Sequence, residues 1–151
     1  MTFEAIDNRD TPEGTLPDHG PKPLVIDMEA ETLGNQNFRT TRWTGKHLQL
    51  TLMTIPAGGD IGLEVHEDVD QFLRIESGTG KCQMGPAEDD LPFEVEVSGD
   101  QSILVPAGTW HNVTNTGDRP LQLYTLYGPA DHVHGTVHKT QKDAEKDPNE
   151  H

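Results

Sequence analysis

The chain has 151 residues and a formal net charge of −15, with 26 acidic residues against 11 Lys and Arg residues. That length suits one domain with a core of its own. The negative charge argues against nucleic acid and against anionic membrane as partners, because both are polyanions. No apolar run is long enough to span a bilayer, and no signal-peptide core follows Met1. Cys82 is the only cysteine, which excludes an intramolecular disulfide and leads us to expect a cytoplasmic protein.

In chain order, residues 1–22 are rich in Pro and Gly and are predicted to form a flexible N-terminal arm. A single barrel domain is predicted over 23–128, followed by a charged C-terminal tail at 129–151. Within the domain, short alternating strands are separated by Gly and Pro turns, and no amphipathic helix is evident. Strands are expected near residues 24–26, 38–44, 47–55, 71–77, 79–84, 93–97 and 121–127. This pattern predicts an all-β sandwich or barrel.

The region 58–78 carries acidic, imidazole and amide groups at strand spacing. Its first half is predicted to be a strand, and alternation along a strand puts Glu64 and His66 on the same face. After a short polar turn, a second strand begins near Gln71. The three side chains converge on one interior spot if that second strand turns Gln71 inward.

Two registers compete for the second strand. If Gln71 points inward, the apolar Leu73 and Ile75 point inward with it, and the charged side chains of the strand face out. If Asp70 points inward instead, an Arg and a Glu of the same strand have to be buried, which is costly without partners. We therefore predict the first register, with Gln71 inside. A bulge at the turn could still bring Asp70 inside as well.

A second stretch, residues 99–115, consists of an apolar strand, a Pro-Ala-Gly turn and a strand that carries His111. Together the two stretches resemble the paired signature motifs of the cupin superfamily. The first motif has the order Gly, His-x-His, Glu and Gly, and the second has the order Gly, Pro-x-Gly, His and Asn. The matching positions here are Gly58, Glu64, His66, Gln71 and Gly78 in the first motif, and Gly99, Pro106, Gly108, His111 and Asn115 in the second.

The chain departs from the superfamily pattern at three places. Glu64 replaces the usual first His, Gln71 replaces the usual Glu, and one extra residue separates Gly99 from Pro106. Four possible ligands remain, but their hardness and charge differ from the usual set. The resemblance implies a jelly roll, the double-stranded β-helix barrel of cupins, as a single domain. It implies little about the reaction, because this superfamily hosts many chemistries on one barrel.

Burying a carboxylate, two imidazoles and an amide together is costly unless something compensates them. A divalent cation compensates all four, so we predict that Glu64, His66, Gln71 and His111 bind a metal ion. Fe(II), Mn(II), Ni(II) and Zn(II) all suit this donor set. The alternative is a buried hydrogen-bond network without metal, in which Glu64 bonds to one of the two histidines.

The predicted function is a metal-dependent enzyme acting on a small oxygenated substrate: an enediol, a hydroxyketone or a sugar-like diol. Dioxygenation and isomerisation or lyase chemistry both remain open. Tyr127 and His134 are candidate acids or bases. Two alternatives are a module that binds metal and a small ligand without turnover, and a structural dimer with a vestigial site.

The tail contains His132, His134 and His138, whose spacing would also allow metal ligation. Contacts at the pocket rim or between subunits suit this turn-like segment better.

Three apolar residues, Ile61, Leu63 and Val65, alternate with Glu64 and His66 along the expected strand. They would face away from the barrel interior, where an apolar surface needs cover. We expect a second subunit to supply that cover and predict a homodimer.

Overall fold

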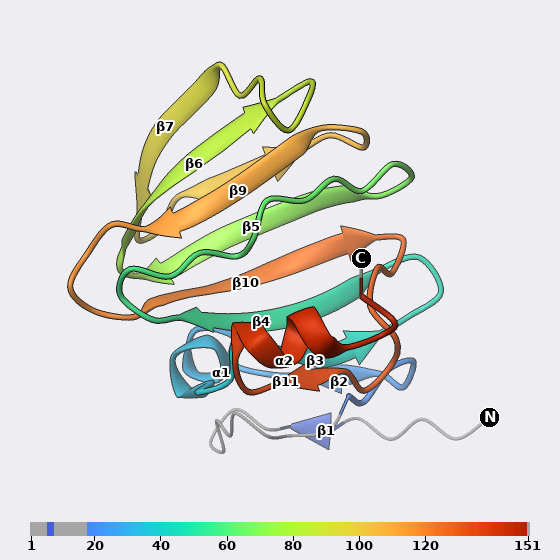
Figure 1. The fold of residues 1–151 in the computed structure, drawn as a ribbon. Helices are drawn as coiled ribbons and strands as arrows, with labels where there is room; N and C mark the ends of the chain where they lie inside the picture. The colour runs from blue at the N-terminus through green and yellow to red at the C-terminus, as the bar shows by residue number, and fades with distance from the viewer. Residues whose placement is uncertain (1–5, 8–17, 151) are drawn as a thin grey trace.

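The computed structural model describes residues 6–7 and 18–150, and its regular secondary structure is mostly antiparallel β-strand in two facing sheets (Figure 1). The larger sheet has the strand order β11-β3-β4-β10-β5-β8, and the smaller has the order β7-β6-β9. The larger sheet contains β3 (Arg39–Thr44), β4 (Gln49–Ile55), β5 (Asp70–Ser77), β8 (Ser102–Val105), β10 (Leu121–Gly128) and β11 (Val137–His138). The smaller sheet contains β6 (Thr79–Gly85), β7 (Phe93–Ser98) and β9 (Trp110–Asn115). The predicted all-β jelly roll is confirmed.

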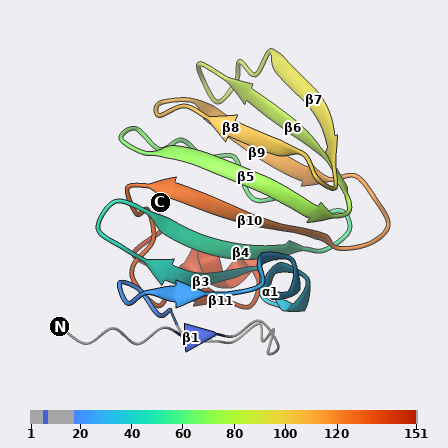
Figure 2. The same cartoon turned by 180° about the vertical axis from the view of Figure 1, so that it is seen from behind.

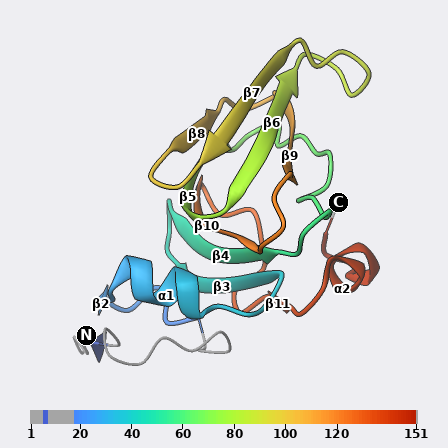
Figure 3. The same cartoon turned by 90° about the vertical axis from the view of Figure 1, so that its left-hand side faces the viewer.

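Four short elements lie outside these two sheets: two strands and two helices. Strands β1 (Ile6–Asp7) and β2 (Leu24–Val25) form a separate parallel pair. Helix α1 (Met28–Gly34) contacts β4, β5 and β10 of the larger sheet. The rear view shows the helix beside this sheet, whose last strand is β8 (Figure 2). Helix α2 (Gln141–Lys146) follows β11 (Figure 3). No helix within residues 18–150 is long and apolar enough to cross a membrane.

The predicted register of β5 is confirmed. Gln71, Leu73 and Ile75 are buried, whereas Asp70 is exposed. Gln71 pairs with Tyr127 on β10 and with Val105 on β8. The Asp70 carboxylate instead accepts a hydrogen bond from the Ala107 backbone N–H at 2.9 Å. The turn at 106–108 is thereby tied to the start of β5.

The barrel interior has an apolar end and a polar end. Along β10 the buried side chains change from Leu121 and Leu123 to Thr125 and Tyr127. Their partners on β4 change in the same sense, in the order Ile55, Met53, Thr51 and Gln49. The apolar end forms the hydrophobic core, and the polar end is where the motif residues converge.

The segment 58–66 is not a regular strand, so that prediction is wrong. It runs along β9 with two isolated bridges, at Asp60 and at Glu64, and Gly62 has a φ of +95°. This left-handed residue breaks the alternation, because only glycine adopts such a backbone readily. Ile61 is therefore buried in the core, while Leu63 is exposed. The continuous outer apolar face was predicted wrongly, and the homodimer stays a prediction without that support.

Helix α1 was not expected from the sequence. Its N-cap is Asp27, whose side chain accepts a hydrogen bond from the Ala30 N–H. Glu31 on this helix is fully buried and accepts a hydrogen bond from Arg42 Nε on β3 at 2.5 Å. A seven-residue helix is too short to be stable by itself, so this ion pair and the contacts with the sheet position it.

The described segments on both sides of the predicted barrel domain contact β3. Residues 1–5 and 8–17 of the predicted N-terminal arm lie outside the described residues. Asp18 accepts hydrogen bonds from the Thr44 hydroxyl and from the Gly135 N–H. Strand β11 pairs with β3, and α2 then begins at a capping box formed by Thr140 and Asp143.

Candidate metal site

Glu64, His66 and His111 each bring one potential ligand atom to within 4.8 Å of the others. Glu64 Oε1 lies 3.2 Å from His66 Nε2 and 3.5 Å from His111 Nε2. Reciprocal backbone hydrogen bonds between Glu64 and His111 hold the irregular segment against β9. The Gly108 N–H donates to the His66 carbonyl at 2.8 Å, which links the Pro-Ala-Gly turn to the same residues. Residues of both motifs therefore meet at one point.

The His111 ring is oriented as a metal ligand should be. Its Nδ1 lies 3.0 Å from the Thr109 carbonyl oxygen, which can only accept a hydrogen bond. Nδ1 must therefore carry the proton, and this tautomer leaves a lone pair on Nε2. Nε2 is buried and has no hydrogen-bond partner.

His66 lies between two carboxylates. Its Nε2 faces Glu64. Its Nδ1 lies 3.1 Å from Asp131 Oδ1, and these two atoms form an ion pair without hydrogen-bond geometry. Burial by itself lowers the pKa of His66, but interactions with Asp131 and Glu64 outweigh it and raise that pKa to about 10. The ring is thus protonated at neutral pH unless a cation takes the place of the Nε2 proton.

The Glu64 carboxyl group is ionised. Burial by itself would raise its pKa, but the imidazoles of His111 and His66 outweigh burial and hold that pKa well below its usual range.

Gln71 is buried nearby on β5, and its Nε2 donates to the Thr125 hydroxyl at 2.9 Å. Its Oε1 is buried and has no partner.

These donors fit a divalent cation. One carboxylate, two imidazole nitrogens and an amide oxygen form a set that suits first-row metals. Gln71 Oε1 is a buried polar atom without a hydrogen-bond partner, and such an atom costs roughly 1–3 kcal/mol. His111 Nε2 is also buried without a hydrogen bond and faces Glu64 Oε1 at 3.5 Å. A cleft of about 350 Å³ reaches Glu64 and is also lined by Arg39, Leu63 and Gln141. The donors can therefore hold a cation, and the cleft gives a small molecule access as far as Glu64.

Of the two candidate acid–base residues, only Tyr127 lies beside the site. Its ring meets that of His66 edge-on at 5.7 Å, and its hydroxyl lies 3.1 Å from His132 Nε2. Complete burial raises the pKa of Tyr127 far above its ordinary value, so the hydroxyl keeps its proton. His134 is half-exposed, and its Nε2 donates to the Gly20 carbonyl at 2.8 Å. The structure thus places His134 at a surface turn.

The tail histidines do not form a second metal cluster within the described part of the chain. His132 and His138 are buried and contact carboxylates, Glu150 at 2.8 Å and Asp147 at 2.9 Å respectively.

Asp131, which contacts His66, was missed by sequence reasoning. It lies after the last long strand, where no periodicity indicates which way a side chain points.

Replacing Asp131 with Asn should weaken metal binding about 10–100-fold, because a carboxylate beside a ligating imidazole orients it and raises its basicity. Competition against a chromophoric chelator measures the affinity. Asp118→Asn, in an exposed turn, is the matched control. An Asp131→Asn variant that binds metal as tightly as the unmodified chain would remove Asp131 from the site.

Metal binding at pH 8 should release about one proton, because the pKa of His66 near 10 keeps its ring protonated in the metal-free chain. Calorimetry in two buffers of different ionisation enthalpy measures that proton. Affinity should rise with pH until about pH 10. The protonated ring stabilises the metal-free fold fully below its unfolded pKa of about 6.5, and this contribution is lost as pH rises through about 10. A binding enthalpy independent of buffer would contradict this assignment.

Comparison with known proteins gives the family. The cupin domain family matches residues 51–127. Uncharacterized protein YrkC of Bacillus subtilis (strain 168) is 56% identical over 129 residues, which are 85% of this chain and 69% of that protein. Uncharacterized protein L612 of Acanthamoeba polyphaga mimivirus is 40% identical over 114 residues, 75% of this chain and 69% of that protein. The crystal structure of BH2720 from Bacillus halodurans has a TM-score of 0.85 and 57% identity, covering 86% of this chain and 98% of that one. The chain therefore belongs to the cupin family.

Proposed function

We propose that this cupin binds a divalent metal ion through Glu64, His66 and His111, with Gln71 as a weaker fourth donor, and acts on a small oxygenated molecule. The observation that carries the proposal is the convergence of these donors, two of them with buried atoms that lack a hydrogen-bond partner, beside a cleft that Glu64 lines. When bound, the ion supplies Lewis acidity, or redox chemistry if it is iron. Enediols, hydroxyketones and sugar-like diols fit because they present adjacent oxygens.

The protein's own residues hold and shield the reacting groups. Asp131 orients His66, and Thr109 fixes the tautomer of His111. Tyr127 keeps its phenolic proton and can donate it in a hydrogen bond, but it cannot serve as a base at neutral pH. The buried wall of β4, β5 and β10 excludes water from the inner side of the site.

A module that binds metal and ligand without turnover is the second candidate function. It is favoured by the positions of the two candidate acid–base residues. Tyr127 is held in its protonated form, and His134 is engaged at a turn that also involves Asp18 and Gly20. Neither residue offers a free base to the cleft.

Metal analysis of untagged chain, followed by a substrate panel, separates these functions. Oxygen uptake with enediols and diketones in the iron-loaded protein would show dioxygenation. Product formation without oxygen, followed by NMR, would show isomerisation or lyase chemistry. Saturable ligand binding with no product would favour the binding module. Failure to bind any first-row divalent ion would overturn the metal-centred function altogether.

A further inference from the structure

A second built site lies in the same cleft, at the carboxylate of Glu150. Glu150 Oε1 accepts a hydrogen bond from Arg39 Nη1 at 2.9 Å, and Oε2 lies 2.8 Å from His132 Nδ1. The two oxygens of one carboxylate are therefore bound by two different cationic or polar side chains. Arg39 and His132 are 3% and 5% exposed, so both donors are buried groups.

The donors are fixed by their own neighbours. Because a carboxylate only accepts, His132 Nδ1 carries a proton, and its Nε2 lies 3.1 Å from the Tyr127 hydroxyl. The Arg39 guanidinium lies 5.2 Å from the Phe38 ring, and its Nη1 also contacts His138 Nδ1 at 3.2 Å. Arg39 Nε is buried without a partner, so the guanidinium has donor capacity that Glu150 leaves unused.

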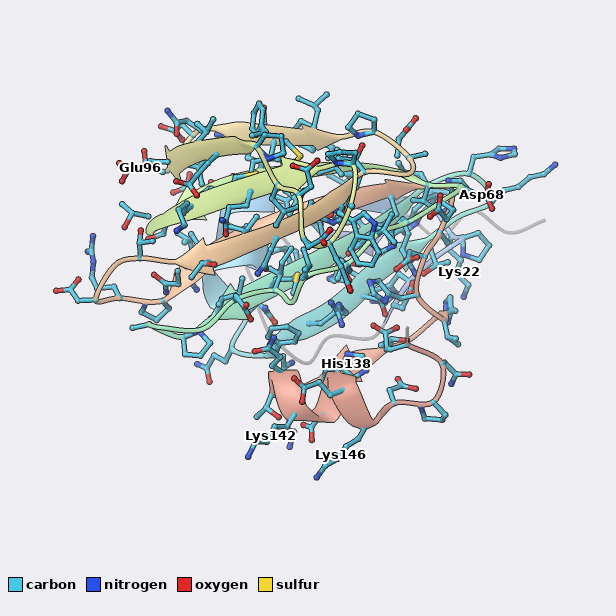
Figure 4. The ribbon with its side chains drawn as sticks, turned by 45° about the horizontal axis from the view of Figure 1, so that its top comes forward. Lys22, Asp68, Glu96, His138, Lys142 and Lys146 are labelled. Carbon is cyan, nitrogen blue, oxygen red and sulfur yellow. The ribbon has the colours of Figure 1, made fainter. Side chains whose placement is uncertain are left out.

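Glu150 reaches this site from the segment after α2. That segment is held by Asp147, which contacts His138 at 2.9 Å and follows the helix directly. Figure 4 shows His138 between α2 and the barrel, while Lys142 and Lys146 point away from the barrel. The cleft that Arg39 and Glu150 line also reaches Glu64 of the candidate metal site.

We propose that Arg39 and His132 bind the carboxylate of a small organic acid, and that Glu150 occupies this site until the acid displaces it. The inference deepens the proposed function, on which it rests for the role of the ligand's remaining oxygens. With its carboxylate at Arg39 and His132, a small acid directs those oxygens along the cleft toward Glu64. The substrate class is then an oxygenated carboxylic acid.

A carboxylate suits this site better than a more highly charged anion. The two donors match the two oxygens of one carboxylate, as Glu150 already shows. Glu64 and Asp131 carry negative charge nearby, and like charges disfavour a dianion such as phosphate.

The test is acetate binding to the full chain, followed by NMR titration and repeated after chelation of metal. In Glu150→Ala the internal competitor is gone, so acetate should bind at least about tenfold more tightly than it binds the unmodified chain. Glu145→Ala is the matched control, because Glu145 is an exposed acid that lines the same cleft. It should change acetate affinity by less than about threefold. Adding Arg39→Met to Glu150→Ala should reverse the gain, because methionine has no cationic donor to replace Arg39 Nη1 at the carboxylate oxygen.

Three results would overturn the inference: no gain of acetate affinity in Glu150→Ala, an equal gain in Glu145→Ala, or equally tight binding of chloride. If Arg39→Met does not fold, His132→Asn in the Glu150→Ala background replaces it and should also reverse the gain. Because the titration is repeated without metal, its outcome is separate from failure of the metal-centred function.

Discussion

Replacing His111 with Ala is expected to lower divalent-metal affinity by more than about 100-fold. The variant loses a strong nitrogen donor whose lone pair is already aimed at the site by the Thr109 carbonyl. Isothermal titration of metal into each variant at fixed pH measures the effect. His47→Ala, which removes an exposed histidine, should bind metal like the unmodified chain.

The same titration ranks the other donors. His66→Ala should lose as much affinity as His111→Ala, whereas Gln71→Ala should lose less, because an amide oxygen is a weak neutral donor and water can replace it. Metal binding at full strength by His111→Ala would place the metal elsewhere in the chain.

Replacing Glu31 with Ala should lower the free energy of unfolding by about 3–5 kcal/mol. Glu31 and Arg42 are both fully buried, and the variant leaves the guanidinium without this carboxylate in a dry environment. Urea denaturation followed by tryptophan fluorescence and circular dichroism measures the loss.

Glu29→Ala is the control for that experiment, because Glu29 lies on the same helix and is exposed. It should cost less than about 1 kcal/mol. A combined Glu31→Leu and Arg42→Met variant should recover much of the stability, because a well-packed apolar pair can replace a buried ion pair. A Glu31→Ala variant as stable as Glu29→Ala would show that the pair contributes little.

The parts of the fold that the sequence predicted are those governed by alternation and burial cost. The register of β5 followed from the cost of burying its Arg and Glu side chains, and the structure has Gln71 inside. Spacing likewise indicated that Glu64, His66 and His111 would converge. Both predictions depend only on the order of side chains along one strand and on the fixed spacing of the motif residues.

The parts that the sequence did not predict depend on contacts between distant residues. Gly62 adopts a left-handed conformation that breaks the expected strand, and a lone glycine does not reveal its φ. Helix α1 depends on the pairing of Glu31 with Arg42 across the fold. Asp131 and Glu150 reach the cleft from irregular segments, where no period indicates the direction of a side chain.

Anomalous diffraction at the absorption edge of the bound metal, from crystals of the metal-loaded chain, would locate the ion relative to Glu64, His66 and His111. We expect one peak about 2.0–2.2 Å from Nε2 of His66, Nε2 of His111 and a carboxylate oxygen of Glu64. A peak at His132, His134 or His138 with none at these three residues would contradict it, and so would the absence of any peak after soaking with divalent metal.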